Sequence, residues 1–132
     1  MPRESILGGS EVIAFAPTTD PAKARAFYEG LLGLRLVADE KPFSLVFDLN
    51  GVMLRVTTVQ ELKAQPFTIL GWRTAEIEAA VDRLVAAGVK FERYPGVNDS
   101  DARGIWNSPG GARIAWFKDP DGNVLSLTEF SK

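Results

Sequence analysis

The sequence predicts an α+β fold built from two tandem βαβββ modules, and three observations support that prediction. First, apolar periodicity gives one strand, one helix and three further strands, and this order occurs twice along the chain. Second, a hairpin signal precedes the last strand of each half, Asn50-Gly51 in the first and Asp121-Gly122 in the second. Third, the alternation of side chains along these last strands is preserved when the halves are aligned, as two sheets related by two-fold symmetry require.

We expect one domain over residues 1–132, with module one at about 11–59 and module two at about 67–130. In the first module, "EVIAFAP" is a short apolar strand. A helix follows, which Thr19 or Asp20 can cap and which has Pro21 at its first position. Its apolar residues have helical spacing, and a glycine ends it. Three strands are then predicted, at 34–39, 43–49 and 52–59.

In the second module, a strand at 67–73 leads into the clearest helix of the chain, which Thr74 can cap and Gly88 can end. A short strand is predicted at 90–94. Residues 95–104 are expected to form a mobile polar loop. Within it, residues 98–103 are interpreted first as a solvated loop and second as a lid. The last two strands form a hairpin.

The composition is that of an ordinary globular protein and excludes several kinds of site. Hydrophobic residues make up 45% and charged residues 24% of the 132 residues, enough to build a core without covalent staples. Cys is absent, which excludes disulfides, thiolate metal sites and cysteine nucleophiles, and agrees with a cytoplasmic protein. His is also absent, which excludes a Ser-His-Asp triad and any His-ligated metal.

Charge and hydropathy argue against nucleic-acid and membrane partners. The net charge is −2, and no basic stripe is present that could follow a phosphate backbone. The apolar runs are too short to cross a bilayer. We therefore expect neither nucleic acid nor membrane as a partner.

Three stretches resemble the vicinal oxygen chelate superfamily, which includes glyoxalase I, extradiol dioxygenases and bleomycin-resistance proteins. They are "AFYEGLLGL" (26–34), "VDRLVAAGVKF" (81–91) and "WFKDPDGNVLSL" (116–127), and the resemblance covers about residues 11–130. It implies an open, partly closed eight-stranded sheet with helices outside and a concave face that holds the site. Because this fold hosts many reactions, the resemblance does not specify one.

The resemblance also gives the places where metal-dependent members hold a divalent ion with His, Glu or Gln. In this chain those four places carry Ile13, Arg55, Ile69 and Ser126. Two of these residues are apolar, one is a fixed cation and one is a weak neutral donor, so they do not suit a divalent ion. We therefore expect no metal and no cofactor, and the metal-dependent chemistry of the family is not carried over.

Asp119, Asp121 and Asn123 have the first spacings of a calcium-binding loop. However, Val124 stands where such a loop needs glycine, and Phe130 stands where it needs glutamate. The favoured interpretation is a turn whose side chains bind backbone amides.

Arg55 is the sharpest candidate for a ligand-binding residue. Strand alternation places Met53, Arg55 and Thr57 on one face, which the resemblance makes the cavity face. Arg73 has the same inward parity in the second module. A guanidinium in an apolar cleft would suit a carboxylate, phosphate or enolate oxygen. The alternative is a structural ion pair of Arg55 with one of the carboxylates of Glu11, Asp48 and Glu129.

Aromatic side chains are the second candidate feature. Phe15 and Phe130 share inward parity with Ile13 and Ser126, and Trp106 precedes a Gly-rich turn. A cleft with aromatic walls and few polar anchors suits a flat hydrophobic ligand. Core packing is the alternative for each tryptophan.

The expected function is that of a metal-free protein, similar to glyoxalases and bleomycin-resistance proteins, that binds a small apolar or anionic molecule in the concave cleft. The resemblance implies a homodimer. The alternatives are a metal-independent lyase or isomerase that uses Arg and carboxylate groups, a metal-dependent lyase or dioxygenase, and a structural dimerisation module. No catalytic residue is assigned. The cleft candidates are Ile13, Phe15, Met53, Arg55, Thr57, Ile69, Arg73, Trp106, Ser126 and Phe130.

Overall fold

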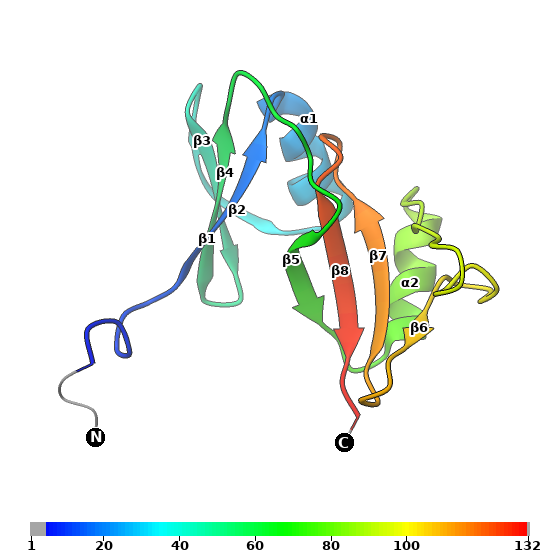
Figure 1. Cartoon of the computed structure of the whole chain (residues 1–132). Helices are drawn as coiled ribbons and strands as arrows, with labels where there is room; N and C mark the ends of the chain where they lie inside the picture. The colour runs from blue at the N-terminus through cyan, green and yellow to red at the C-terminus, as the bar shows by residue number, and fades with distance from the viewer. Residues whose placement is uncertain (1–4, 132) are drawn as a thin grey trace.

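The computed structural model describes residues 5–131 and shows two four-stranded sheets with helices packed on one side (Figure 1). Its elements follow the predicted order. They are β1 (Ile13–Thr18), α1 (Pro21–Arg25), η1 (Ala26–Leu31), β2 (Arg35–Glu40), β3 (Ser44–Leu49), β4 (Val52–Thr58), β5 (Thr68–Arg73), α2 (Ile77–Ala86), β6 (Trp106–Asn107), β7 (Arg113–Lys118) and β8 (Val124–Glu129).

The two sheets have matching topologies. The first has the strand order β1-β4-β3-β2, and the second has the order β5-β8-β7-β6. In each sheet the first strand pairs in parallel with the last strand of its module, and the remaining pairs are antiparallel. The inner edges β1 and β5 contact each other. The prediction of an α+β fold with two βαβββ modules is therefore confirmed.

One hydrophobic core serves both modules. On β4, the buried Leu54 and Val56 point to the helix side of the sheet and alternate with residues of the opposite side, which we call the open face. On β8, Leu125 also lies on the helix side. The ring of Phe27, in η1, lies 6.4 Å from that of Phe117, in β7. Because the helix of the first module packs against the sheet of the second, the modules share their apolar interior.

The first helix begins as predicted and ends in an unusual way. Asp20 caps it and Pro21 is its first residue. From Ala26 the helix widens into a π-helix, in which the amide of Leu32 donates to the carbonyl of Phe27 at 2.9 Å. Gly33 then leaves the helix with φ 75°, as the predicted stop requires.

The second helix begins two residues later than a cap at Thr74 predicts. Thr74 does not cap it, because α2 starts at Ile77. Its first amide is instead capped from a distant strand, since Ile77 donates to the carboxylate of Glu129 at 2.8 Å. The predicted strand at 90–94 is also wrong, because only Phe91 forms an isolated bridge to β7.

The loop over residues 95–104 is anchored from inside by Asn98, which is 2% exposed. The side-chain amide of Asn98 donates to the carbonyls of Glu92 at 3.0 Å and Gly104 at 2.6 Å, and its oxygen accepts from the amide of Tyr94 at 2.7 Å. The expectation of a solvated loop therefore fails at this residue, and its anchoring does not favour a lid.

The turn at Asp119–Asn123 fastens the two modules to each other. The carboxylate of Asp121 accepts hydrogen bonds from the hydroxyl of Thr18 at 2.6 Å and from the amide and hydroxyl of Thr19 at 2.9 and 2.7 Å. The side-chain amide of Asn123 donates to the carbonyl of Pro17 at 3.0 Å. The turn of the second module thus holds the end of the first strand of the first.

Asp119 organises this turn from within. Its carboxylate accepts from the amides of Asp121 at 3.0 Å and Asn123 at 2.9 Å, which confirms the predicted turn chemistry. It also accepts from the hydroxyl of Tyr28 at 2.7 Å.

Among residues 5–131, no helix has the length and apolar character needed to cross a bilayer.

Candidate functional site

The open face of the first sheet brings together five of the predicted site residues. In the parallel β1–β4 pair, Ile13 lies beside Met53, and Phe15 lies beside Arg55. Thr57 is two residues further along β4 on the same face. Phe15 is 60% exposed and Ile13 47% exposed. This apolar surface is turned away from α1, because the intervening residues of both strands are buried on the core side.

Arg55 is held by a carboxylate in this structure. Its guanidinium lies 2.6 Å from the Glu40 carboxylate and donates to the hydroxyl of Ser44 at 3.0 Å. The expected alternative of a structural ion pair therefore describes the geometry, although the partner is none of the three carboxylates named for it. Glu40 comes close because it pairs with Ser44 across the β2–β3 hairpin.

The open face of the second sheet has a shallow floor beside a large aromatic residue. Across three neighbouring strands, Trp116 is in register with Ser126, and Ser126 is in register with Gly71. A Cβ atom at Gly71 would stand 2.6 Å from the hydroxyl oxygen of Ser126. The two smallest side chains of this row therefore stand together beside Trp116, with Ser126 7% exposed and Gly71 exposed.

Three aromatic residues form a wall along this floor. The ring centroids of Trp106 and Trp116 are 6.0 Å apart, with an interplanar angle of 31°. Tyr94 meets Trp116 edge-on at 5.6 Å and 77°. Burial, with a smaller contribution from the Glu92 carboxylate, raises the pKa of Tyr94. All three rings are only partly buried, so an apolar ligand can reach them.

Arg73 and Phe130 lie together at the far end of the same sheet. The guanidinium carbon of Arg73 is 5.1 Å from the centroid of the Phe130 ring, within the range of a cation–π contact. Both residues line a hollow of about 430 Å³. A second hollow of about 330 Å³ lies on the first sheet, and Met53 and Val37 contribute to its lining.

Ile69 differs from the other predicted site residues. The register of β5 against β8 shifts between Thr68 and Leu70, so simple alternation does not hold at this point. Ile69 is partly buried and packs against the core.

The metal positions implied by the resemblance do not form a metal site. Residues 5–131 contain no group of three His, Cys, Asp or Glu side chains that could hold an ion. Ile13 offers no donor atom, Arg55 is a cation paired with Glu40, and Ser126 contributes one neutral hydroxyl next to Gly71. These donors do not fit a divalent cation, so no chemical step is derived through one.

The topology and the position of these faces match a known family. Residues 12–127 match the family model described as the Glyoxalase/Bleomycin resistance protein/Dioxygenase superfamily. The chain belongs to this superfamily. No curated protein matched the sequence.

Several solved structures share the fold with this chain at low sequence identity. Lactoylglutathione lyase from Agrobacterium tumefaciens aligns with TM-score 0.69 and 19% identity, over 92% of this chain and 93% of that one. A glyoxalase/bleomycin resistance protein/dioxygenase from Nocardioides gives TM-score 0.71 and 19% identity, over 97% and 87%. TioX from Micromonospora sp. ML1 gives TM-score 0.68 and 17% identity, over 93% and 100%. At these identities the comparison supports the fold alone.

Sequence reasoning missed two members of the second face. They are Gly71 and Tyr94, neither of which is among the predicted cleft candidates. The register could have indicated Gly71, because it aligns with Ser126 in the parallel pair. The position of Tyr94 had no sequence signal, because it lies outside any strand.

Proposed function

We propose that this superfamily member binds a flat, predominantly apolar small molecule, without a metal, on the open faces of its two sheets. The observation that carries the proposal is the wall of Tyr94, Trp106 and Trp116 beside the low floor of Ser126 and Gly71. An aromatic ligand lying on this floor would contact the Trp116 ring edge-on and bury apolar area against it.

The state of Arg55 supports binding over a metal-independent lyase or isomerase. An arginine that stabilised a developing oxyanion would need free donors aimed at the reacting atom. The guanidinium of Arg55 is instead engaged by Glu40 and Ser44. An anionic substituent on the ligand would find a more accessible cation in Arg73, whose partner is the Phe130 ring.

The proposal includes a homodimer in which a second copy covers the open faces. Phe15 is 60% exposed and Phe130 53% exposed, and the apolar surface around them is the kind that marks an interaction site. A ligand on either face of a single chain would remain open to solvent on one side. With a second copy over it, the ligand would be enclosed between chains. The proposal places this dimer in the cytoplasm, a setting with which the Cys-free composition agrees.

The binding experiment is a titration of the full chain with naphthoate and with the neutral naphthalenemethanol, followed by tryptophan fluorescence. Trp116→Leu and Trp106→Leu should each weaken binding by about two- to tenfold, which corresponds to the roughly 0.5–1.5 kcal/mol of an aromatic pair. Trp72→Phe is the matched control, because Trp72 stacks on Phe117 in the core, 6.4 Å away. If neither compound binds, or if all three variants bind equally well, the proposal is wrong.

The dimer is tested separately by light scattering. Phe15→Asp should shift the chain from dimer to monomer, because a desolvated carboxylate in an apolar interface is costly. An unchanged mass for wild type and Phe15→Asp would refute the dimer without bearing on the aromatic wall.

A further inference from the structure

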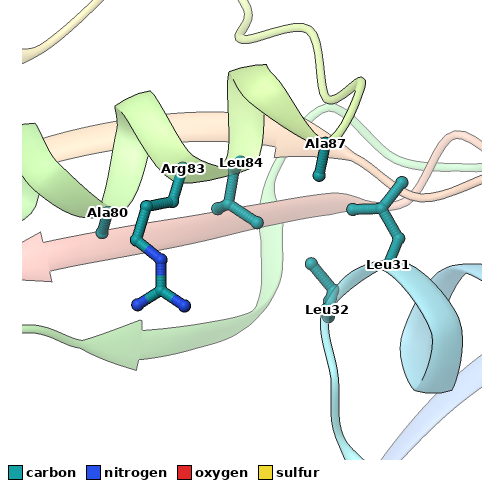
Figure 2. A pocket seen from close by; sticks show the side chains of 6 residues that line it. All are labelled: Leu31, Leu32, Ala80, Arg83, Leu84 and Ala87. Atoms are coloured by element: carbon teal, nitrogen blue, oxygen red, sulfur yellow. The ribbon is translucent and has the colours of Figure 1, made fainter.

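A groove of about 360 Å³ runs between the end of η1 and the helix α2, on the side of the molecule opposite to the open sheet faces. Figure 2 shows Leu31 and Leu32 turned toward Leu84 and Ala87 across this groove. Ala80 lies one turn back on α2. The walls are therefore aliphatic, and the volume is that of a small-molecule site.

The groove exists because of the shape of its two helices. The π-helix inserts an extra residue into the turn before Leu32, whose amide reaches back five residues to Phe27. π-helical turns are rare in proteins, and those that occur are often found at functional sites. On α2, the small side chains of Ala80 and Ala87 flank Leu84 and leave room on either side of it.

Arg83 is the charged residue that lines this groove. It is exposed, and within residues 5–131 its side chain has no ion-pair partner. The acidic residues of α2 are engaged elsewhere. Glu78 lies 2.7 Å from Arg113, and Asp82 lies 2.9 Å from Arg103. Figure 2 shows the Arg83 side chain extending away from α2, with Leu84 between it and Leu31.

We propose that this groove is a second ligand site, which binds an amphiphilic carboxylate. The alkyl chain would lie against Leu31, Leu32 and Leu84, where it removes apolar surface from water. The carboxylate would accept two parallel hydrogen bonds from the Arg83 guanidinium, whose planar fork matches it. The site is independent of the aromatic wall, because the two lie on opposite sides of the sheets.

The test is a titration of the full chain with decanoate, followed by NMR chemical shifts of the groove residues, with decanol as the neutral probe. Arg83→Gln should weaken decanoate binding about two- to fivefold and leave decanol binding unchanged, since a partly exposed ion pair contributes about 0.2–1 kcal/mol. Lys23→Gln is the matched control. It removes the same charge from an exposed position of α1 outside the groove and should change neither affinity.

A gain-of-function variant completes the test. Ala87→Lys adds a second cation at the groove, close to the C-terminus of α2 where positive charge is favourable, and should tighten decanoate binding by a similar factor. Both changes are at exposed positions, so folding is preserved and is checked by thermal unfolding. Absence of decanoate binding, or equal affinities in wild type, Arg83→Gln and Ala87→Lys, would overturn the proposal. Groove resonances that shift with protein concentration and not with decanoate would assign the groove to a contact between copies and overturn it as well.

Discussion

The hydroxyl of Tyr28 donates a 2.7 Å hydrogen bond to the carboxylate of Asp119, and this bond ties the helix of the first module to the closing turn of the second. Both residues are buried, with Tyr28 1% exposed. Burial, followed by the negative charge of Asp119, raises the pKa of Tyr28. The phenol therefore keeps its proton and remains the donor.

Replacing Tyr28 by Phe should lower the free energy of unfolding at neutral pH by about 1–3 kcal/mol, because a buried carboxylate loses one donor. Asp119 keeps the amides of Asp121 and Asn123, which limits the loss. Urea unfolding measures it. Tyr94→Phe is the control, since Tyr94 is partly exposed and the change should stay within about 0.5 kcal/mol. Equal effects of the two variants would contradict the role of the Tyr28 bond.

The same residue predicts a pH dependence. In the unfolded chain Tyr28 ionises near pH 10, whereas in the folded chain its pKa is raised. Above about pH 10 the folded state therefore binds more protons than the unfolded state, and stability falls as the pH rises. The advantage of wild type over Tyr28→Phe should be full below pH 10 and shrink above it, by up to about 1.4 kcal/mol per pH unit. An advantage that stays constant as the pH rises past 10 would show that Tyr28 is not protected in this way.

Asp121 should be the strongest polar link between the modules. Asp121→Ala removes the bonds to Thr18 and Thr19 and should cost about 1–3 kcal/mol in chemical unfolding. Asp99→Ala is the matched control, because exposed Asp99 accepts a single bond from the amide of Gly96. It should cost clearly less, and a comparable loss in both variants would argue against the link.

Asn98 should determine the order of its loop. Asn98→Ala leaves the amide of Tyr94 and two carbonyls without their partner, and we expect a loss of at least about 2 kcal/mol. Trypsin should then cleave faster at Arg93, which precedes the loop, and at Arg103, which lies within it. Ser100→Ala, at an exposed position of the same loop, should leave cleavage unchanged. Cleavage of both variants at the wild-type rate would mean that the loop is ordered by other contacts.

The ion pair between Arg55 and Glu40 should contribute little to stability. The side chains are 30% and 48% exposed, so a double-mutant cycle with Arg55→Gln and Glu40→Gln should give a coupling of about 0.2–1 kcal/mol. A coupling well above this range would identify the pair as a buried structural element.

The sequence predicted the topology because the information is local. The helix start at Asp20-Pro21 and the hairpin at Asn50-Gly51 are fixed by the conformations that these residues adopt, and both turn residues of the hairpin have positive φ in the structure. The errors occurred where a distant residue took over a local role. Glu129 caps α2 in place of Thr74, and no local pattern indicates that.

The candidate site was predicted in part for the same reason. Strand parity placed Phe15 and Arg55 on one face, and their register in the β1–β4 pair follows that parity. The partner of Arg55 depends on the β2–β3 hairpin, which brings Glu40 to Ser44. The position of Tyr94 depends on a loop anchored by Asn98. The partner of Arg55 and the position of Tyr94 both result from tertiary packing. No spacing of residues along a single sequence predicts them.

The contact between Gly71 and Ser126 couples the sizes of two positions on different strands. Because a Cβ at position 71 would meet the Ser126 hydroxyl at 2.6 Å, a larger residue at position 71 requires the Ser126 side chain to move. In the proposed binding mode, the sizes of these two residues would limit the thickness of a ligand that lies beside Trp116. A redesign of this protein for a bulkier or a metal-bound ligand would therefore have to begin by choosing which of positions 71 and 126 is to be substituted.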